Sequence, residues 1–241
     1  MKNLWNIFTD KLGLTVLHPQ YYMNKYNRFA IKQIKNFSKD KTIVDFGCGR
    51  MSYKKYLLET CKSYFGIDHP TESKNYISNE KPDLLTHFEK TKLKNNSYNT
   101  AMMLEVLEYL ERPSTPEEVL KEIHRILKKN GKIFLTSPFM YPIHDRKIDR
   151  NRFTAQKINN LLKDAGFKKI KVAQQGNFYV FVTTSVLVYM FKKINNLNKM
   201  YQLFLIPAGL LLSLILNILT LFFENNNDDD FPINILAIAE K

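Results

Sequence analysis

Cysteine is scarce in this chain, and its scarcity excludes two classes of protein. The 241 residues contain only Cys48 and Cys61, and neither a Cys-x-x-Cys motif nor a Cys/His cluster occurs. A structural zinc site needs such a cluster, so we predict that the protein binds no metal. A disulfide framework is also excluded, and the composition fits a reducing compartment.

An uninterrupted apolar run is missing from the first residues. Asp10 and Lys11 break the segment MKNLWNIFTDKLGL, which therefore has no stretch of signal-peptide length. We expect an amphipathic helix in this segment and a cytoplasmic location for the protein.

Acidic residues are outnumbered, 23 against 36 basic ones, which gives a formal net charge of +13. Such a surface attracts phosphates on nucleic acid, anionic lipid or an acidic metabolite. The lysines are scattered, without an arginine-rich or aromatic-interleaved tract, so nucleic acid is a poor candidate. Lysines that are merely solvated explain the charge equally well.

Apolar runs alternate with helical patterns along most of the chain. This alternation predicts an α/β protein with a Rossmann-like, seven-stranded, mostly parallel sheet that helices cover on both faces. The expected strands lie in the segments KTIVDFG, SYFGIDH, PDLLTHF, SYNTAMMLEVL, KIFLTSP, KKIKVAQ and DDDFPINILAIAEK.

One helix has clear signals at both ends. Thr115 is a natural N-cap and Pro116 suits the first helical position. Lys128 and Lys129 are expected in the last turn, at the negative end of the helix dipole. Gly131 is expected to end the helix in a left-handed conformation.

The segment IVDFGCGRMSY suggests a ligand site after the first strand. Ligands of parallel sheets bind beyond the carboxyl ends of the strands, where Gly47 and Gly49 would let the backbone approach. Asp68 ends the second strand, at the offset where an acid binds ribose hydroxyls in dinucleotide folds. A glycine turn with a helix-capping aspartate is the competing interpretation. The third glycine of the nicotinamide motif is replaced by Ser52, which favours a ligand without phosphates.

Five segments together resemble the class I S-adenosylmethionine-dependent methyltransferases of the type 11 kind, over about residues 41–170. The loop GCGRMSY with YFGID is similar to a subgroup associated with cell-surface glycan biosynthesis. The matching segments are VDFGCG, YFGIDH, NNSYNTAMMLEVLEYL, VLKEIHRILKKNGKIFLTSPF and DAGF.

The resemblance implies S-adenosylmethionine as the cofactor and assigns residues to it. Asp68 would bind the ribose hydroxyls, and Leu104 and Glu105 would belong to a wall that extends to Glu108. His87 replaces the acid that usually contacts the adenine amine, with Glu89 two residues further on. The methionine portion would be held by Asp45, Gly47, Cys48 and Gly49.

The segment after the fifth strand would face the methyl acceptor. The subgroup's residues there correspond to Pro138, His144, Asp149, Arg152 and Thr154. His144 is a candidate general base because its reference pKa of ~6.5 suits neutral pH. Asp149 could orient it, and Arg152 could hold an anionic acceptor or pair with Asp149. A loop held by an Asp–Arg pair, with Thr154 as the cap of a helix, is the structural alternative.

Residues 176–223 contain two long apolar segments, the second interrupted by Pro207. A single span would place the last strand on the wrong side of a membrane. A two-span hairpin would carry three lysines across it, against the positive-inside tendency. We therefore expect two helices on or in a membrane interface, beside the acceptor. A helical cap or a dimer face is the alternative.

The sequence features together predict one function and one location. The chain would be a methyltransferase acting on a hydroxyl of a glycan or a membrane-associated intermediate, cytoplasmic or peripheral on the inner face of the membrane. A non-catalytic cofactor-binding protein and a nicotinamide oxidoreductase are the alternatives.

The predicted organisation has four parts. They are a helical lead-in at 1–40, the core at 41–175, the insert at 176–223 and the final core strand at 224–241.

Overall fold

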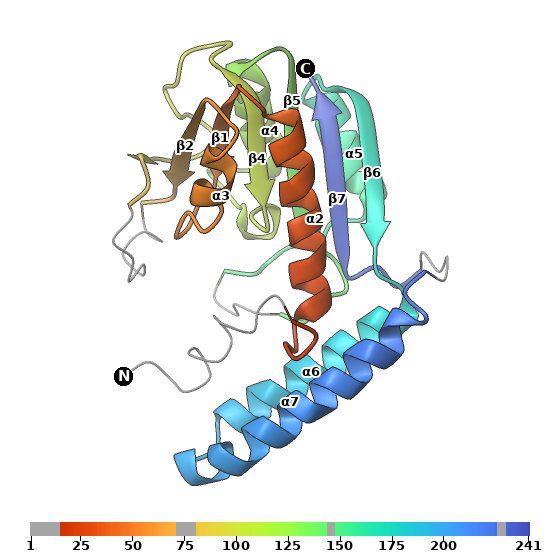
Figure 1. Cartoon of the computed structure of the whole chain (residues 1–241). Helices are drawn as coiled ribbons and strands as arrows, with labels where there is room; N and C mark the ends of the chain where they lie inside the picture. Colours follow the sequence, from red (N-terminus) through yellow and green to blue (C-terminus); the bar gives the residue numbers. More distant parts are fainter. Residues whose placement is uncertain (1–14, 71–80, 144–147, 226–229) are drawn as a thin grey trace. The chain divides into compact units, whose positions relative to one another are not determined.

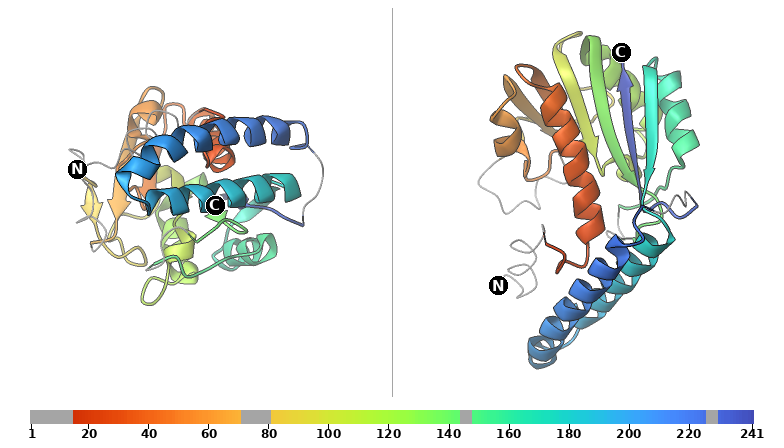
Figure 2. Two further views of the ribbon diagram at one scale, coloured as in Figure 1. Left: turned by 90° about the horizontal axis from the view of Figure 1, so that it is seen from below. Right: turned by 45° about the vertical axis from the view of Figure 1, so that its right-hand side comes forward.

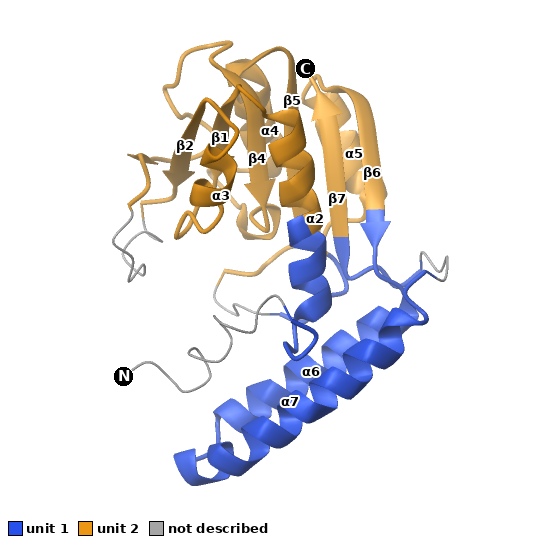
Figure 3. Ribbon diagram, in the orientation of Figure 1, with its two compact units in different colours: residues 1–28, 139–144, 174–234 blue, residues 29–138, 145–173, 235–241 orange. Residues whose placement is uncertain are grey.

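The computed structural model describes residues 15–70, 81–143, 148–225 and 230–241. The chain divides into two compact units, shown in orange and blue in Figure 3. The orange unit contains residues 29–138, 145–173 and 235–241, and it carries most of a β-sheet. The blue unit contains residues 1–28, 139–144 and 174–234, and it carries two long helices.

The sheet has seven strands in the order β3-β2-β1-β4-β5-β7-β6. Strand β1 pairs in parallel with both β2 and β4, and β4 pairs in parallel with β5. Figure 1 shows the arrow of β7 pointing opposite to those of β4 and β6. The predicted seven-stranded, mostly parallel sheet is confirmed. The strands are β1 (Thr42–Phe46), β2 (Ser63–Asp68), β3 (Leu84–Leu85), β4 (Tyr98–Leu104), β5 (Leu127–Pro138), β6 (Lys168–Gln175) and β7 (Asn234–Glu240).

Helices cover both faces of the sheet in the described part of the chain (Figure 1). Helices α2 (Tyr21–Phe37) and α3 (Lys54–Leu58) lie in front of it, and α4 (Pro116–Ile126) and α5 (Ala155–Asp164) lie behind it. A buried cluster joins α2 and α3 to the strands because apolar side chains of both helices face the sheet. Its most buried members are Ile34, Ile43, Leu57, Met102 and Phe134.

The N-terminus of α4 has the predicted cap. The Thr115 hydroxyl accepts the backbone N–H of Glu118, the Glu118 side chain accepts the backbone N–H of Thr115, and Pro116 is the first helical residue. This capping box satisfies two of the N–H groups that a helix start leaves unpaired. Helix α5 has a simpler cap, in which the Thr154 hydroxyl accepts the backbone N–H of Lys157.

The predicted C-terminus of α4 was wrong. The helix ends at Ile126, and Lys128 and Lys129 already belong to β5, which begins at Leu127 opposite Tyr98 of β4. Asn130, with φ of 61°, takes the left-handed conformation that was expected of Gly131. The glycine is needed for another reason, since a Cβ there would lie 2.8 Å from the backbone oxygen of Lys128 and 3.0 Å from that of Asn99.

The insert forms two antiparallel helices, α6 (Phe178–Asn195) and α7 (Lys199–Leu221), which lie side by side in both views of Figure 2. Helix α7 continues through Pro207, so the expected interruption at this residue was wrong. The two ends of the hairpin meet, because the Asn177 side chain donates to the backbone oxygens of Phe223 and Glu224 at 2.8 and 3.2 Å.

The capping box of α4 gives a stability prediction. We expect Thr115→Ala to lower the free energy of unfolding by about 1 kcal/mol, because the first turn loses its hydroxyl acceptor. Urea unfolding followed by circular dichroism measures the change. Thr115→Ser, which keeps the hydroxyl, is the matched control. If Ser and Ala cost the same, the stability at this position does not come from the cap.

Candidate active site

The carboxyl ends of β1, β2, β3 and β4 lie at one edge of the sheet, because these strands are parallel and in register. Asp45 lies opposite both Gly66 and Met102, and Asp68 lies opposite Leu85. The segments that follow the strands therefore meet there, and they carry most of the residues singled out in the sequence.

The glycine loop is held against β2 and β4. The backbone N–H groups of Gly47 and Cys48 donate to the Ile67 oxygen at 2.9 and 3.1 Å. Gly47 has φ of +73°, and a Cβ there would lie 2.3 Å from Cγ2 of Val106. Gly49 also has a positive φ, of 52°. The first glycine is therefore required by the segment after β4 as well as by any ligand.

Gly66 of β2 explains how this loop tolerates bulky residues. Cys48 and Met51 are buried, and a Cβ on Gly66 would lie 2.9 Å from Sγ of Cys48 and 3.0 Å from Sδ of Met51. Met51 adopts a positive φ of 52°. A glycine in the neighbouring strand makes the space that a smaller residue in the loop would otherwise provide.

Asp68 connects the loop to the end of β2. Its carboxylate accepts the backbone N–H of Gly49 at 3.1 Å and that of His69 at 2.7 Å. The residue is only 4% exposed. A carboxylate has about four acceptor positions, so two remain open to further donors.

Asp45 is buried beneath the loop, where the Tyr64 hydroxyl donates to its Oδ2. Burial raises the pKa of Asp45 to about 7, against the hydrogen bond from Tyr64, and the charge of Asp68 adds to the rise. Burial also raises the pKa of the Cys48 thiol, which is therefore protonated and not a nucleophile. The sequence analysis missed Tyr64, because a tyrosine near the start of a strand gives no local signal for a contact with Asp45.

His87 lies after β3, on the exposed side of the same edge. Its Nδ1 is 3.2 Å from Nε2 of His69, and the two rings meet edge to face with centroids 4.7 Å apart. His69 directly follows Asp68, so the two histidines continue the surface that begins at this carboxylate. His69 was not predicted as a site residue, because only the fold brings it to His87.

Two glutamates follow β4 in a largely apolar setting. Oε1 of Glu105 and both carboxylate oxygens of Glu108 are buried and have no hydrogen-bond partner among the described residues. Burial raises the pKa of both side chains, and the charge of Glu105 raises that of Glu108 further. Glu105 also has a positive φ of 56°, a strained conformation for this residue type. Two acids in the apolar run LEVLEYL were the signal available in the sequence.

The segment before α5 is tied to the Glu108 turn. The backbone N–H groups of Arg150 and Asn151 donate to the Glu108 oxygen at 3.2 and 3.1 Å. Asp149 has a fully buried side chain and forms a two-armed ion pair with Arg152, with one arm of 2.8 Å. This is the Asp–Arg pair that the sequence left open as the structural alternative. Arg152 lowers the pKa of Glu105 and Glu108 only partly, since burial outweighs its charge.

The remaining predicted residues divide between two places. Leu104 ends β4 next to Glu105, at the same edge. His144 lies outside the described residues, so its role as a base stays a prediction, as do the assigned roles of the other residues.

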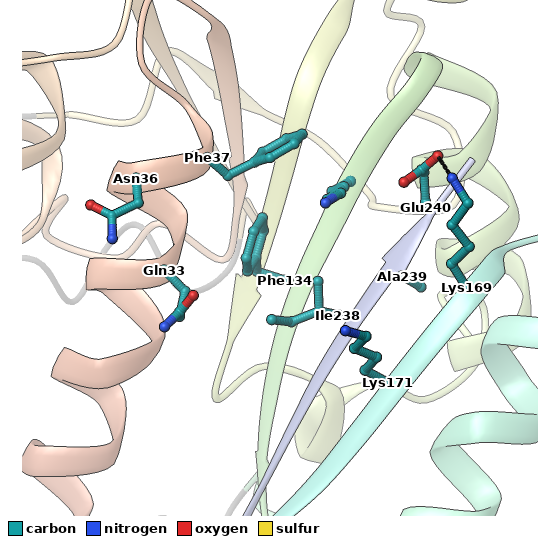
Figure 4. A pocket seen from close by; sticks show the side chains of 10 residues that line it. Gln33, Asn36, Phe37, Phe134, Lys169, Lys171, Ile238, Ala239 and Glu240 are labelled. Carbon is teal, nitrogen blue, oxygen red and sulfur yellow. Dashed lines mark hydrogen bonds and ion pairs between the residues drawn. The ribbon is translucent and has the colours of Figure 1, made fainter.

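A separate cavity of about 480 Å³ lies on the sheet and contains none of the predicted site residues. Figure 4 shows it between the end of α2 and strands β5, β7 and β6, with an ion pair of 2.7 Å between Lys169 and Glu240. Phe37 and Phe134 form its apolar wall. Because Lys169 stands at the beginning of β6, this cavity is not at the carboxyl edge.

The chain has similarity to known proteins at the level of a domain family and of fold. A family model described as a methyltransferase domain matches residues 44–135, which include most of β1, the glycine loop, Asp68 and both glutamates. A search of curated proteins finds no match.

Solved structures extend the similarity to nearly the whole chain. An S-adenosylmethionine-dependent methyltransferase from Archaeoglobus fulgidus is 14% identical, with a TM-score of 0.60, and the match covers 99% of this chain and 100% of that one. A possible histamine N-methyltransferase from Thermotoga maritima is 16% identical, with coverages of 92% and 97% and a TM-score of 0.53. Phosphoethanolamine N-methyltransferase 2 from Haemonchus contortus, solved with S-adenosyl-L-methionine, is 13% identical, with coverages of 89% and 52% and a TM-score of 0.55.

These similarities agree with the order of strands and with the glycine loop that closes on Asp68. A methyltransferase-domain family model matches the strands that build this edge, and the fold is that of S-adenosylmethionine-dependent methyltransferases, the class that the sequence resembles.

Proposed function

We propose that this methyltransferase transfers a methyl group to a hydroxyl of a glycan or of a membrane-associated small molecule. The buried carboxyl pair Glu105 and Glu108, at the edge that carries the glycine loop, is the observation on which the proposal depends. A hydroxyl loses its proton when it is methylated, so a base must accept that proton. A carboxylate whose pKa is raised is a stronger base than an ordinary carboxylate, and this pair provides such groups.

The residues at the edge fit the cofactor. The loop has no side chain at Gly47 and Gly49, and the acids Asp45, Asp68, Glu105 and Glu108 gather around it. Carboxylates attract the positive sulfonium and ammonium groups of S-adenosylmethionine and repel the pyrophosphate of a nicotinamide cofactor. Although the whole chain is strongly basic, this edge is acidic.

The cofactor would be held by the residues that the sequence assigned to it. Asp68 would accept the ribose hydroxyls with the acceptor positions that Gly49 and His69 leave open. His87 would meet the adenine, and Asp45 with the loop would meet the methionine part. When bound, S-adenosylmethionine supplies a methyl group on a sulfonium, a good leaving group, so positioning contributes much of the catalysis.

Glu105 is the described side chain best suited to take the proton of the acceptor. Its Oε1 has no hydrogen-bond partner among the described residues, and its raised pKa makes the ionised form a stronger base than an ordinary carboxylate. Arg152 stays charged and holds Asp149, and through this pair it limits the negative charge around the glutamates. His144 remains the alternative base.

The acceptor class and the location are proposed together. The similarity of GCGRMSY and YFGID to the glycan-associated subgroup supports a glycan acceptor, and the apolar residues 176–223 support an acceptor at a membrane. The proposed location is the cytoplasm, on the inner face of the membrane, where the basic surface would meet anionic lipid.

Cofactor binding is the first test. We expect calorimetric titration to show that S-adenosylmethionine and S-adenosylhomocysteine both bind, and that Asp68→Asn weakens both by about tenfold to a hundredfold, because a hydrogen bond to a charged acceptor is lost. Asp164→Asn, on the exposed end of α5, is the matched control and should bind like wild type.

The titration separates the competing functions. Failure of both ligands to bind to the folded protein would remove the methyltransferase function. Binding followed by no transfer of radiolabelled methyl groups to glycan or lipid-linked extracts would favour the non-catalytic alternative.

The buried glutamate pair gives a pH prediction. The raised pKa of Glu108 means that the folded protein holds a proton that the unfolded chain releases above its ordinary pKa of ~4.3. Stability is therefore greatest below that value and is lost as the pH rises toward the folded pKa. Relative to Glu108→Gln, wild type should lose stability from about pH 5 to pH 8, with a slope of up to ~1.4 kcal/mol per pH unit.

Thermal unfolding of both proteins across this range measures the difference. Glu117→Gln, an exposed acid in the first turn of α4, is the control and should run parallel to wild type. A constant difference between wild type and Glu108→Gln would mean that Glu108 is ionised throughout.

A further inference from the structure

The outer surface of α7 is apolar around most of its circumference. Leu203, Phe204 and Leu205 are consecutive and all exposed, and three consecutive residues spread over about 200° of a helix. Two pairs of consecutive exposed apolar residues follow further along the helix, Leu211 with Leu212 and Ile218 with Leu219. Exposed members of the helix include Met200 at 64%, Leu203 at 64%, Phe204 at 71%, Leu211 at 58%, Ile215 at 47% and Leu219 at 52%.

The polar side chains of the same helix are on its inside. The buried residues of α7 are Gln202, Ile206, Gly209, Ser213, Asn217 and Thr220. Water-soluble helices have the opposite arrangement, with apolar residues buried and polar residues exposed. In a lipid environment, small and polar residues gather at helix–helix contacts while apolar residues face outward.

The donors among these inner polar groups are paired within the blue unit, whereas Oδ1 of Asn217 is buried without a partner among the described residues. The hydroxyls of Thr183 and Thr220 are 2.7 Å apart, which joins α6 to α7. Asn217 donates to the backbone oxygens of Val16 and His18 at 2.7 and 3.1 Å. A polar residue whose donors are paired in this way can face the protein interior while the outside of the hairpin stays apolar.

The two helices approach closely at a glycine. A Cβ on Gly209 would lie 3.0 Å from Cζ of Phe191 and 3.2 Å from Cε of Met190. Small residues that let backbones approach are typical of helix contacts in membranes.

Charged and aromatic residues mark both ends of the hairpin. At the tip, which we define as residues 192–199, are Lys192, Lys193 and Lys199, with the exposed Tyr189 and Tyr201 beside it. At the other end Tyr179 stacks on Phe223 with ring centroids 4.7 Å apart, and Lys25 pairs with Glu224. Aromatic rings and lysines are enriched at the two interfaces of a bilayer.

The length of α7 matches a bilayer. The helix has 23 residues, its most apolar window has a mean hydropathy of 2.3, and 28% of that window is buried. At ~1.5 Å per residue it spans about 35 Å, against ~30 Å for the hydrocarbon core. Among the described residues α7 alone is long and apolar enough to span by itself, and α6, with 18 residues and about 27 Å, would cross only as its partner in the hairpin. The low burial separates α7 from the core helix of a soluble protein.

The same observations disfavour two helices lying in the membrane interface, which is the position expected from the sequence. A helix in the interface plane presents a polar face to water, but no charged residue lies between Lys199 and Glu224, and four polar side chains of α7 are buried. A dimer face would need one apolar stripe, not most of the circumference.

We propose that the α6–α7 hairpin inserts across a lipid bilayer, with both of its ends on one side and the tip in the headgroups of the far side. The three lysines then cross against the positive-inside tendency, but the apolar outer surface and buried polar side of α7 outweigh that tendency here. The outward leucines, isoleucines and phenylalanines would contact the hydrocarbon, and the three lysines would meet lipid phosphates. This inference stands on the hairpin alone and does not depend on the acceptor proposed above.

Flotation with vesicles of phosphatidylcholine and phosphatidylglycerol tests the insertion. The full chain, transferred from detergent, should float with the vesicles and stay bound in about 1 M NaCl, at which charges are screened beyond ~3 Å. Leu211→Arg combined with Ile215→Arg should weaken binding on the order of a hundredfold, because the charges would lie in hydrocarbon.

A matched variant controls for the loss of an exposed apolar residue. Leu58, 44% exposed at the end of α3, is outside the hairpin, so Leu58→Arg should float like wild type. Circular dichroism and cofactor titration in detergent should show that the double variant remains folded, which also keeps this test separate from that of the proposed function.

Thiol labelling tests whether the hairpin crosses the bilayer. Cys48 and Cys61 are buried, so Asn196→Cys places an accessible thiol at the tip. In vesicles with the protein added from outside, a membrane-impermeant maleimide should label this thiol only after detergent is added.

Three outcomes would overturn the proposal. Release by salt would show that the hairpin only adheres to the surface. Immediate labelling of Asn196→Cys in salt-resistant vesicles would show that it enters one leaflet without crossing. A soluble dimer that ignores vesicles would show that a second copy covers the apolar surface.

Discussion

The attachment of the glycine loop to β2 is the constraint on which the proposed active site depends. Gly49 donates to Asp68, Gly47 and Cys48 donate to Ile67, and Gly66 leaves room for the side chains of Cys48 and Met51. Loop and strand are thus fixed by backbone hydrogen bonds and by packing together. The missing third glycine of the loop is a consequence of this packing, since the required space is made in the neighbouring strand.

Several buried carboxyl groups lie close together in the candidate site, which is electrostatically unfavourable. Asp45, Glu105 and Glu108 are carboxyl groups whose burial raises their pKa, and Glu105 has a strained backbone conformation. Burying acids without full hydrogen bonding is costly, and it persists where the surrounding structure enforces it. Such an acidic edge would match a cationic cofactor, and a protonated Glu108 lowers the negative charge of the edge at neutral pH.

The blue unit follows a different rule from the orange one. In the sheet, apolar side chains such as Ile43 and Phe134 are buried, as in any water-soluble protein. In α7 the buried residues are mostly polar or small and the exposed ones are apolar. One chain can contain both arrangements when its two parts meet different solvents, so the sidedness of a helix reports its surroundings more directly than its composition does.

The sequence determined the features that depend on neighbours along the chain: the strands, the caps at Thr115 and Thr154, the glycine loop and the acid at the end of β2. The sequence determined less about contacts between residues that are far apart along the chain. Only the tertiary structure decided that Tyr64 donates to Asp45, that Glu108 is buried without a partner among the described residues, and that β5 begins before Gly131 by pairing with β4. It also decided which side of α7 is buried, because a helix that is apolar on most sides has no periodic pattern to reveal it. Local signals specify elements, whereas contacts between elements specify protonation, strain and exposure.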